Sequence, residues 1–221
     1  MASKILRYAA AWLVTLLVPL TLVFLGVRLL LTPGFLAVEY RLPGFPADTY
    51  GFTLDDRLEY APRALEYLVS DLGIDFLAGQ TFPDGTSLYN RRELDHMLDV
   101  KNVLVPGLRI GLAATLVLFG TLIFSWRKPF WPDFLLAVRR GGWVMVGTVA
   151  AIALVALVSF WDFFTAFHTL FFEGDSWLFY YSDTLIRLFP MRFWQDVFIT
   201  IGAFCLLAGL AIALGLKPSK G

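Results

Sequence analysis

The sequence predicts an all-α, polytopic membrane protein with four transmembrane helices, a helical first loop and an aromatic second loop. The composition, the lengths of the apolar runs and the positions of the basic residues all support this fold class. Of the 221 residues, 58% are hydrophobic and 16% are charged, whereas soluble domains average about 45–50% and about 25%. The net charge is zero, so no global basic field favours nucleic acid, and we expect no nucleic-acid partner.

Four apolar runs are long enough to cross a membrane, which takes about 20 residues for roughly 30 Å of hydrocarbon. We treat residues 1–221 as a single membrane domain, with transmembrane helices at about 8–31, 103–124, 143–164 and 197–216. The first run exceeds the apolar core of a cleaved signal peptide and is interpreted as a signal anchor. Residues 32–102 and 165–196 then form the two long loops.

The basic residues predict the orientation of these helices. They cluster before the first run, between the second and third, and after the fourth: Lys4, Arg7, Arg127, Lys128, Arg139, Arg140, Lys217 and Lys220. The only acid in these segments is Asp133. By the positive-inside rule, both termini are cytoplasmic and the two long loops face outwards.

The first outer loop carries two helix-start signals. Thr53 with Asp56 predicts an N-cap for a helix with apolar residues at helical spacing, and Pro83-Asp84-Gly85 predicts a turn. Asn90 with Glu93 predicts the start of a second helix, on which Glu93, His96 and Asp99 share one polar face.

The second outer segment is unusually aromatic, a composition typical of an amphipathic stretch in the outer membrane interface. Within it, a short helix is expected from Ser182 or Asp183 to Phe189-Pro190.

The only two histidines, His96 and His168, fall in these two outer segments. If the four spans form a bundle, both imidazoles lie at similar depth near the outer surface. The alternative is that each only makes a hydrogen bond in an interfacial pocket. Two histidines without a cysteine or a tight carboxylate cluster make a weak metal signature, so we expect no metal and no cofactor.

Two arginines, Arg28 and Arg109, lie inside apolar runs about one turn from their outer ends. Either they extend to the headgroups or they line a polar cavity and bind an oxyanion. Asp162, near the outer end of the third run, is a possible ion-pair partner. Lys101 is either a solvated cation or a cavity residue.

Other chemistries have weaker support. No serine sits in a G-x-S-x-G elbow, although Ser176 and Ser182 are close in sequence to His168, which keeps open a membrane lipid hydrolase with a serine nucleophile. A non-enzymatic lipid- or peptide-binding membrane protein is a second alternative. The spans lack the series of inward-facing ionisable side chains that a proton-coupled transporter needs. The single cysteine, Cys205, excludes intramolecular disulfides.

Two stretches resemble a known family. Glu93-Leu-Asp-His-Met-Leu-Asp-Val-Lys101 is similar to its E-x-x-H-M-x-D-V-K motif, and Phe167-His-Thr-Leu-Phe-Phe172, followed by Trp177 and Leu188-Phe-Pro190, resembles its second signature. The family is Lit, the bacterial lipoprotein intramolecular transacylase, a small four-span protein of the cell membrane. Residues 38–82 match neither stretch.

The resemblance implies transfer of the sn-2 acyl chain of a diacylglyceryl lipoprotein to the α-amine of its N-terminal cysteine, which gives an N-acylated lyso-lipoprotein. It implies His96 and His168 as catalytic residues at the outer leaflet, in contact with membrane lipids. Supporting or orienting roles are then expected for Glu93, Asp99, Lys101 and Asp162, and oxyanion or substrate binding for Arg28, Arg109 and Trp177. The sequence carries no signal for the oligomeric state.

The chemistry fits these residues. An α-amine has a pKa of about 7.7–8.0 and histidine about 6.5, so proton transfer to an imidazole is uphill by only about 1–2 units. Nucleophile and ester share one molecule, and oriented intramolecular pairs reach effective molarities of roughly 10⁵–10⁸ M. One histidine would then serve as base on the amine while the other acts on the departing glyceryl oxygen, with no assignment between them.

Overall fold

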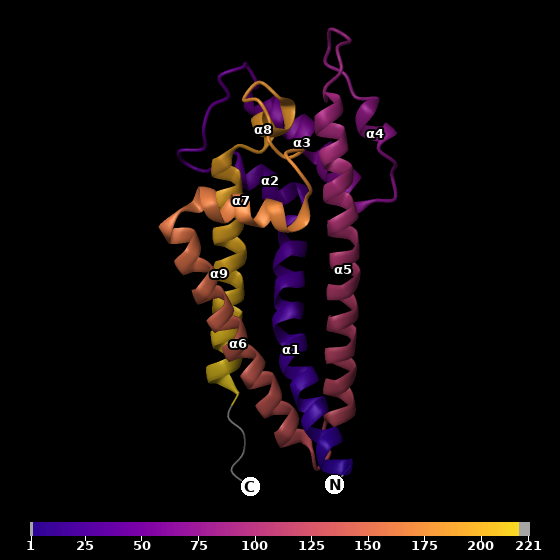
Figure 1. Cartoon of the computed structure of the whole chain (residues 1–221), viewed down its shortest axis with the longest axis vertical. Helices are drawn as coiled ribbons and strands as arrows, with labels where there is room; N and C mark the ends of the chain where they lie inside the picture. The colour runs from indigo at the N-terminus through magenta and orange to yellow at the C-terminus, as the bar shows by residue number, and fades with distance from the viewer. Residues whose placement is uncertain (1, 217–221) are drawn as a thin grey trace. The chain divides into compact units, whose positions relative to one another are not determined.

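The structure, a computed structural model, describes residues 2–216, and its regular structure over that range is helical (Figure 1). The side chain of Lys4 and all of Lys217 and Lys220 lie outside the described residues. In chain order the helices are α1 Ala2–Leu30, α2 Pro33–Glu39, α3 Leu54–Val69, α4 Asp75–Ala78, α5 Arg91–Ser125, α6 Trp131–Val158, α7 Phe160–Phe171, α8 Thr184–Leu188 and α9 Met191–Gly215.

Four of these helices are long and apolar enough to cross a membrane: Ile5–Leu30 within α1, and the whole of α5, α6 and α9. The predicted all-α class and the four transmembrane helices are thereby confirmed.

Helix boundaries differ from the sequence expectation in two places. The second loop helix and the second apolar run form one continuous helix, α5, because no residue after Asn90 stops it and Pro106 is accommodated within it. The third run, expected as one helix over 143–164, is divided between α6 and α7. Ser159 leaves the helical conformation (φ −155°, ψ 109°), and its hydroxyl accepts a hydrogen bond from the Asp162 N–H at the start of α7.

The described chain divides into two compact units. We call the first the span unit; it comprises the described residues of Met1–Val27, Gly107–Val158 and Thr200–Gly221. The second, the loop unit, comprises Arg28–Pro106 and Ser159–Ile199.

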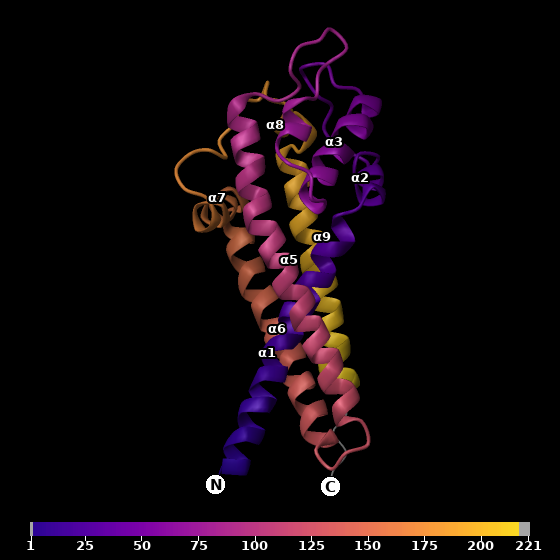
Figure 2. The same ribbon diagram turned by 90° about the vertical axis from the view of Figure 1, so that its right-hand side faces the viewer.

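In the span unit, α6 runs close to α1 (Figure 2), and glycines on α6 allow this close helix packing. A Cβ at Gly141 would lie 2.6 Å from Val18 Cβ and 2.7 Å from the Thr15 carbonyl oxygen on α1. The next residue, Gly142, is equally crowded by α9, since its Cβ would lie 2.8 Å from the Gly209 carbonyl oxygen. Close approach of this kind is how helices associate in lipid, where no hydrophobic force drives them together.

In the loop unit, α3 packs against α2, α4 and α8. The predicted N-cap of α3 is present as a capping box: the Thr53 hydroxyl accepts from the Asp56 N–H, and the Asp56 carboxylate accepts from the Thr53 N–H. The predicted turn is also present, with Gly85 at φ 83°. The five-residue helix α8, close to its expected bounds, is tied to the core by the Tyr40 hydroxyl, which donates to the Leu188 carbonyl (3.0 Å).

The α1–α6 contact predicts a selective cost for one methyl group. Gly141→Ala should lower the free energy of unfolding by about 1–3 kcal/mol, because the added carbon overlaps Val18 and the Thr15 backbone. Thermal unfolding in detergent micelles measures this. Gly147→Ala is the matched control on the same helix, since nothing lies within 4 Å of its Cβ position. Equal stability of the two variants would contradict the close approach.

Candidate functional site: a pair of buried histidines

The loop unit brings the two histidines together. His96 lies in the second turn of α5 and His168 near the end of α7. Their ring centroids are 6.3 Å apart and their planes are inclined by 21°. The two side chains are 8% and 7% exposed. Two imidazoles far apart in the sequence therefore face each other in a buried site.

Aromatic rings surround this pair, and we call them the aromatic cage: Phe164, Phe167, Phe172, Trp177 and Phe179. The rings of Phe172 and Phe179 meet His96 edge-on, with centroids 5.1 and 5.3 Å away. The rings of Phe164 and Trp177 lie 4.1 and 4.7 Å from His168. All five come from α7 and the segment that follows it, so this segment forms most of the lining of the site.

His168 has a defined tautomer. Its Nδ1 lies 2.8 Å from the Phe164 carbonyl oxygen; because a carbonyl only accepts, Nδ1 carries the proton. Nε2 is then left with a free lone pair in the neutral ring. Burial lowers the pKa of His168, while the hydrogen bond to Phe164 acts in the opposite direction. The neutral, proton-accepting form is therefore favoured at neutral pH.

His96 occupies the turn of α5 that follows a buried carboxylate. Glu93 is 1% exposed, and its two oxygens accept hydrogen bonds from the backbone N–H groups of Asn90 (2.8 Å) and Leu185 (2.6 Å). No hydrogen bond joins Glu93 to His96 in the described structure, so the carboxylate fixes the helix start rather than the imidazole directly. The Nδ1 atom of His96 is buried and has no partner among the described residues.

The aromatic segment is also fastened to α5. The Arg92 guanidinium donates to the Leu178 carbonyl (2.9 Å), between Trp177 and Phe179 of the cage. Trp177 is 8% exposed, and its indole N–H is buried without a partner in the described part of the chain. An unpaired buried donor beside an imidazole is the kind of group that stabilises a developing oxyanion.

Other predicted supporting residues lie elsewhere in the loop unit. Lys101 donates to the Leu72 carbonyl (2.6 Å) and its ammonium lies 4.2 Å from the Tyr67 ring centroid. Asp162 is exposed at the first turn of α7, and Asp99 is half-buried on α5. Their proposed roles at the histidines remain predictions.

Arg28 and Arg109 are both exposed. Arg28 belongs to the loop unit and Arg109 to the span unit. Their role as oxyanion ligands also remains a prediction.

No serine is hydrogen-bonded to a histidine among the described residues, so the serine alternative has no dyad there. Ser182 is exposed, whereas the Ser176 hydroxyl is buried and lacks a partner within residues 2–216. No group of three or more His, Cys, Asp or Glu side chains that would hold a metal occurs in the described residues.

Sequence reasoning missed the inward role of the aromatic segment, because the aromatic composition alone predicts only an interfacial location. It also missed Glu39, which is 2% exposed on α2. Burial and the neighbouring Asp196 carboxylate raise the pKa of Glu39 to about 7. No local motif marks this residue, since its burial depends on the packing of α2 against the start of α9.

Comparison with known proteins gives a consistent result. A family model described as lipoprotein intramolecular transacylase Lit matches residues 12–194. An uncharacterized protein of Aquifex aeolicus (strain VF5) is 27% identical over 227 residues, which cover 98% of this chain and 99% of that protein.

Solved structures show the same fold. The in meso structure of the membrane-integral lipoprotein intramolecular transacylase Lit from Bacillus cereus matches with a TM-score of 0.76 at 19% identity, over 95% of this chain and 93% of that one. A variant of the same protein, in which one histidine is replaced by alanine, matches with a TM-score of 0.69 at 19% identity, over 97% and 93% of the two chains.

The environment of His168 predicts an unusual titration. Its midpoint should lie below the ordinary value of about 6.5, because burial disfavours the imidazolium. The unfolded chain then binds the proton more readily, so the free energy of unfolding should fall as the pH drops below about 6.5. NMR of histidine-labelled protein measures the midpoint, and a His96→Gln variant assigns the signals because the chain has only two histidines. A midpoint at or above 6.5 would refute the desolvation.

Proposed function

Because the chain belongs to the lipoprotein intramolecular transacylase family, we propose that it moves the sn-2 acyl chain of a diacylglyceryl lipoprotein to the α-amine of the N-terminal cysteine, with His96 and His168 as the proton-transfer groups. The observation that carries this proposal is the pair of facing imidazoles inside the aromatic cage. The reaction needs a base, a proton donor and protection from water, and no external nucleophile.

His168 is the better candidate for the base on the amine. Its Nδ1–H is directed to the Phe164 carbonyl, so the Nε2 lone pair has a fixed direction. As the amine nitrogen attacks the ester carbonyl carbon, Nε2 takes one of the amine protons. The Phe164 carbonyl then stabilises the imidazolium through the same hydrogen bond.

His96 acts on the glyceryl oxygen. When the tetrahedral intermediate collapses, the carbon–oxygen bond to glycerol breaks and the oxygen takes a proton from His96. That proton is the one His168 took from the amine, passed on to His96 before the collapse. Both imidazoles therefore begin and end neutral, and the proton lost by the amine equals the proton gained by the glyceryl hydroxyl. Because the ring centroids are 6.3 Å apart, the proton travels only a short distance, either directly or through the substrate's own groups.

The indole N–H of Trp177 is proposed as a donor to the oxyanion of the intermediate. It is buried, lies on the ring beside His168, and has no competing partner among the described residues. A preorganised donor in a dry site strengthens as negative charge develops on the carbonyl oxygen.

The aromatic cage favours acyl transfer over hydrolysis. Hydrolysis needs a water molecule close to the base, and the rings around His96 and His168 offer such a water few polar partners. The amine, delivered by the substrate itself, meets no such barrier.

The proposed site faces the outer leaflet of the bacterial cytoplasmic membrane, with both termini cytoplasmic. The distribution of basic residues in the short segments supports this orientation.

The acid–base proposal predicts loss of product on substitution of either histidine. His96→Ala and His168→Ala should each lower formation of the N-acyl lyso-lipoprotein by about 10²-fold or more, the usual contribution of a general acid or base. The assay is mass spectrometry of the N-terminal peptide of a reporter lipoprotein in a bacterium that lacks this activity. Asp95→Asn is the control, an exposed carboxylate on the same turn of α5. Undiminished lyso product in either histidine variant removes that residue from the mechanism. Free fatty acid without N-acylation would instead indicate a hydrolase.

The oxyanion role of Trp177 predicts a change in kcat without a change in folding. Trp177→Phe keeps an aromatic ring but removes the N–H, and kcat should fall by about 10²-fold, as for loss of one oxyanion donor. KM and the melting temperature should stay near those of the unmodified protein. Trp161→Phe is the matched control, since Trp161 lies on α7 and is 55% exposed. An unchanged kcat for Trp177→Phe would leave the indole with a packing role only.

A further inference from the structure

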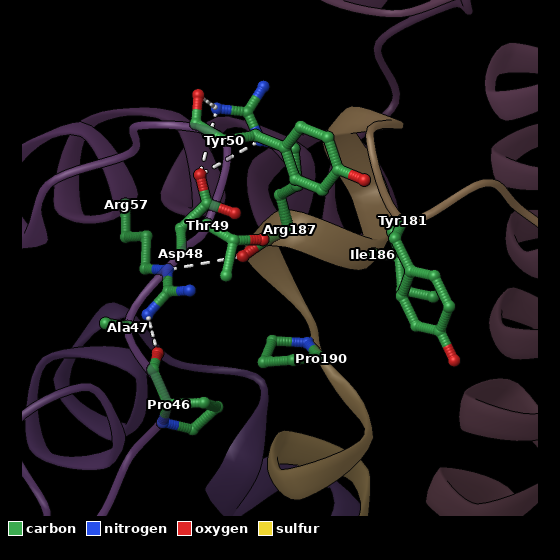
Figure 3. Close-up of a pocket in the computed structure, with 10 residues that line it drawn as sticks. All are labelled: Pro46, Ala47, Asp48, Thr49, Tyr50, Arg57, Tyr181, Ile186, Arg187 and Pro190. Atoms are coloured by element: carbon green, nitrogen blue, oxygen red, sulfur yellow. Dashed lines mark hydrogen bonds and ion pairs between the residues drawn. The ribbon is translucent and has the colours of Figure 1, made fainter.

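The loop unit contains a cavity that none of the cage residues lines. It has a volume of about 290 Å³ and lies between residues 46–50, Arg57 on α3, and the segment 181–190 that includes α8 (Figure 3). Its volume is close to the lower limit for ligand sites in proteins, about 300 Å³. A headgroup or small ion fits this space, whereas a whole lipid does not.

Arg57 is the cation of this cavity. It is 6% exposed, and it donates from Nε to the Arg187 carbonyl (3.2 Å) and from Nη1 to the Pro46 carbonyl (2.8 Å). Its guanidinium carbon also lies 5.1 Å from the Phe45 ring centroid. The third nitrogen, Nη2, makes no hydrogen bond to a described residue, and Figure 3 shows it directed towards the space beside Pro190. Two contacts therefore hold the guanidinium rigidly while its third nitrogen remains available.

The charges that line the cavity do not balance. Its only acid is Asp48, whose Oδ2 accepts hydrogen bonds from Arg187 Nε (3.1 Å), Arg187 Nη2 (3.0 Å) and the Phe52 N–H (2.7 Å). One carboxylate thus faces two guanidinium groups, and its side-chain hydrogen bonds come from Arg187. The lining of the cavity therefore carries one excess positive charge, which we assign to Arg57. A buried cation that shares its nearest carboxylate with a second cation is costly, and binding an anion lowers that cost.

The shape and chemistry of the walls narrow the class of anion. Guanidinium groups match the geometry of phosphate oxygens and hold them by charge-assisted hydrogen bonds. The exposed Thr49 hydroxyl offers a further donor at the rim. Ile186, Pro190 and Tyr181 form an apolar wall that suits the carbon atoms next to a phosphate. For a chain with four membrane-crossing helices, phospholipid is the neighbouring source of phosphate esters.

We propose that this cavity binds the phosphodiester of an anionic phospholipid headgroup, with Arg57 Nη2 contacting the phosphate oxygens. Inorganic phosphate is the alternative source of the same chemistry. The site is separate from the histidine pair, so its existence does not depend on the acyl-transfer reaction.

Native mass spectrometry of the full chain released from detergent provides the test, with phosphatidylglycerol as the anionic probe and phosphatidylcholine as the zwitterionic one. Arg57→Gln should weaken phosphatidylglycerol binding by about tenfold, the effect of one charge-assisted hydrogen bond. Arg91→Gln is the matched control, because Arg91 has an 88% exposed side chain outside the cavity. Since Arg57 also holds two carbonyl groups, Ala47→Phe serves as a second variant: it adds a ring at an exposed lining position of the cavity without removing any polar contact.

Several outcomes decide the proposal. Selective loss of phosphatidylglycerol binding in Arg57→Gln and in Ala47→Phe, with Arg91→Gln unchanged, supports a headgroup site. Competition by millimolar inorganic phosphate supports the phosphate chemistry of the site. Binding of inorganic phosphate without binding of phosphatidylglycerol assigns the free ion as the ligand and overturns the headgroup. Equal binding of the two lipids, or no loss in Ala47→Phe, overturns the proposal. If Arg57→Gln leaves lipid binding undiminished but raises the KM for the lipoprotein, the proposal is overturned, and a carboxylate of the substrate is the ligand of the cavity. The measurements can be repeated in His96→Ala protein, so failure of the proposed reaction and failure of this site are distinguishable.

Discussion

The geometry of the loop unit depends on one buried carboxylate. Glu93 accepts a hydrogen bond from the Asn90 N–H at the start of α5 and another from the Leu185 N–H on α8, a residue 92 positions later. A carboxylate removed from water is stable only when such donors surround it. The two backbone groups therefore fix both segments relative to the turn of α5 that carries His96. Glu93, the first residue of the motif that contains His96, thus anchors that motif to the loop unit.

The short helix α8 connects this anchor to the rest of the loop unit. Five residues are too few for a stable isolated helix, so α8 depends on contacts to the residues around it. The Thr184 hydroxyl donates to the Leu88 carbonyl, and the carbonyls of Arg187 and Leu188 accept from Arg57 and Tyr40. The segment that precedes α8 supplies Trp177 and Phe179 to the aromatic cage, while α8 itself forms one wall of the cavity at Arg57. The histidine site and this cavity are distinct, but both depend on where α8 is held.

The sequence predicted local features well and tertiary ones poorly. The capping box of Thr53 and the turn at Gly85 follow from side chains within a few residues, and the structure has them. The break at Ser159 also has a local signal, a serine three residues before Asp162, but the continuous apolar run obscured it. Glu39 and Arg57 carry no local signal, because their burial arises from contacts with α9 and α8. Two histidines were singled out by their scarcity, whereas the 6.3 Å between their rings depends on how α7 packs against α5.

Neither imidazole is hydrogen-bonded to a carboxylate within the described residues, which is consistent with an amine nucleophile. In a serine hydrolase, an aspartate or glutamate orients the histidine and stabilises its charged form, since a hydroxyl proton is difficult to remove. Here a backbone carbonyl orients His168, and burial keeps its pKa low. In the proposed mechanism a weak base is sufficient, because the attacking nitrogen becomes cationic and then loses its proton readily, as an ammonium group with a pKa of about 8 does. A neutral imidazole in a dry site does not attract water as an ion pair would. In the proposed mechanism, the same burial that weakens the base thus protects the ester from hydrolysis, and the intramolecular geometry of the substrate compensates for the weaker base.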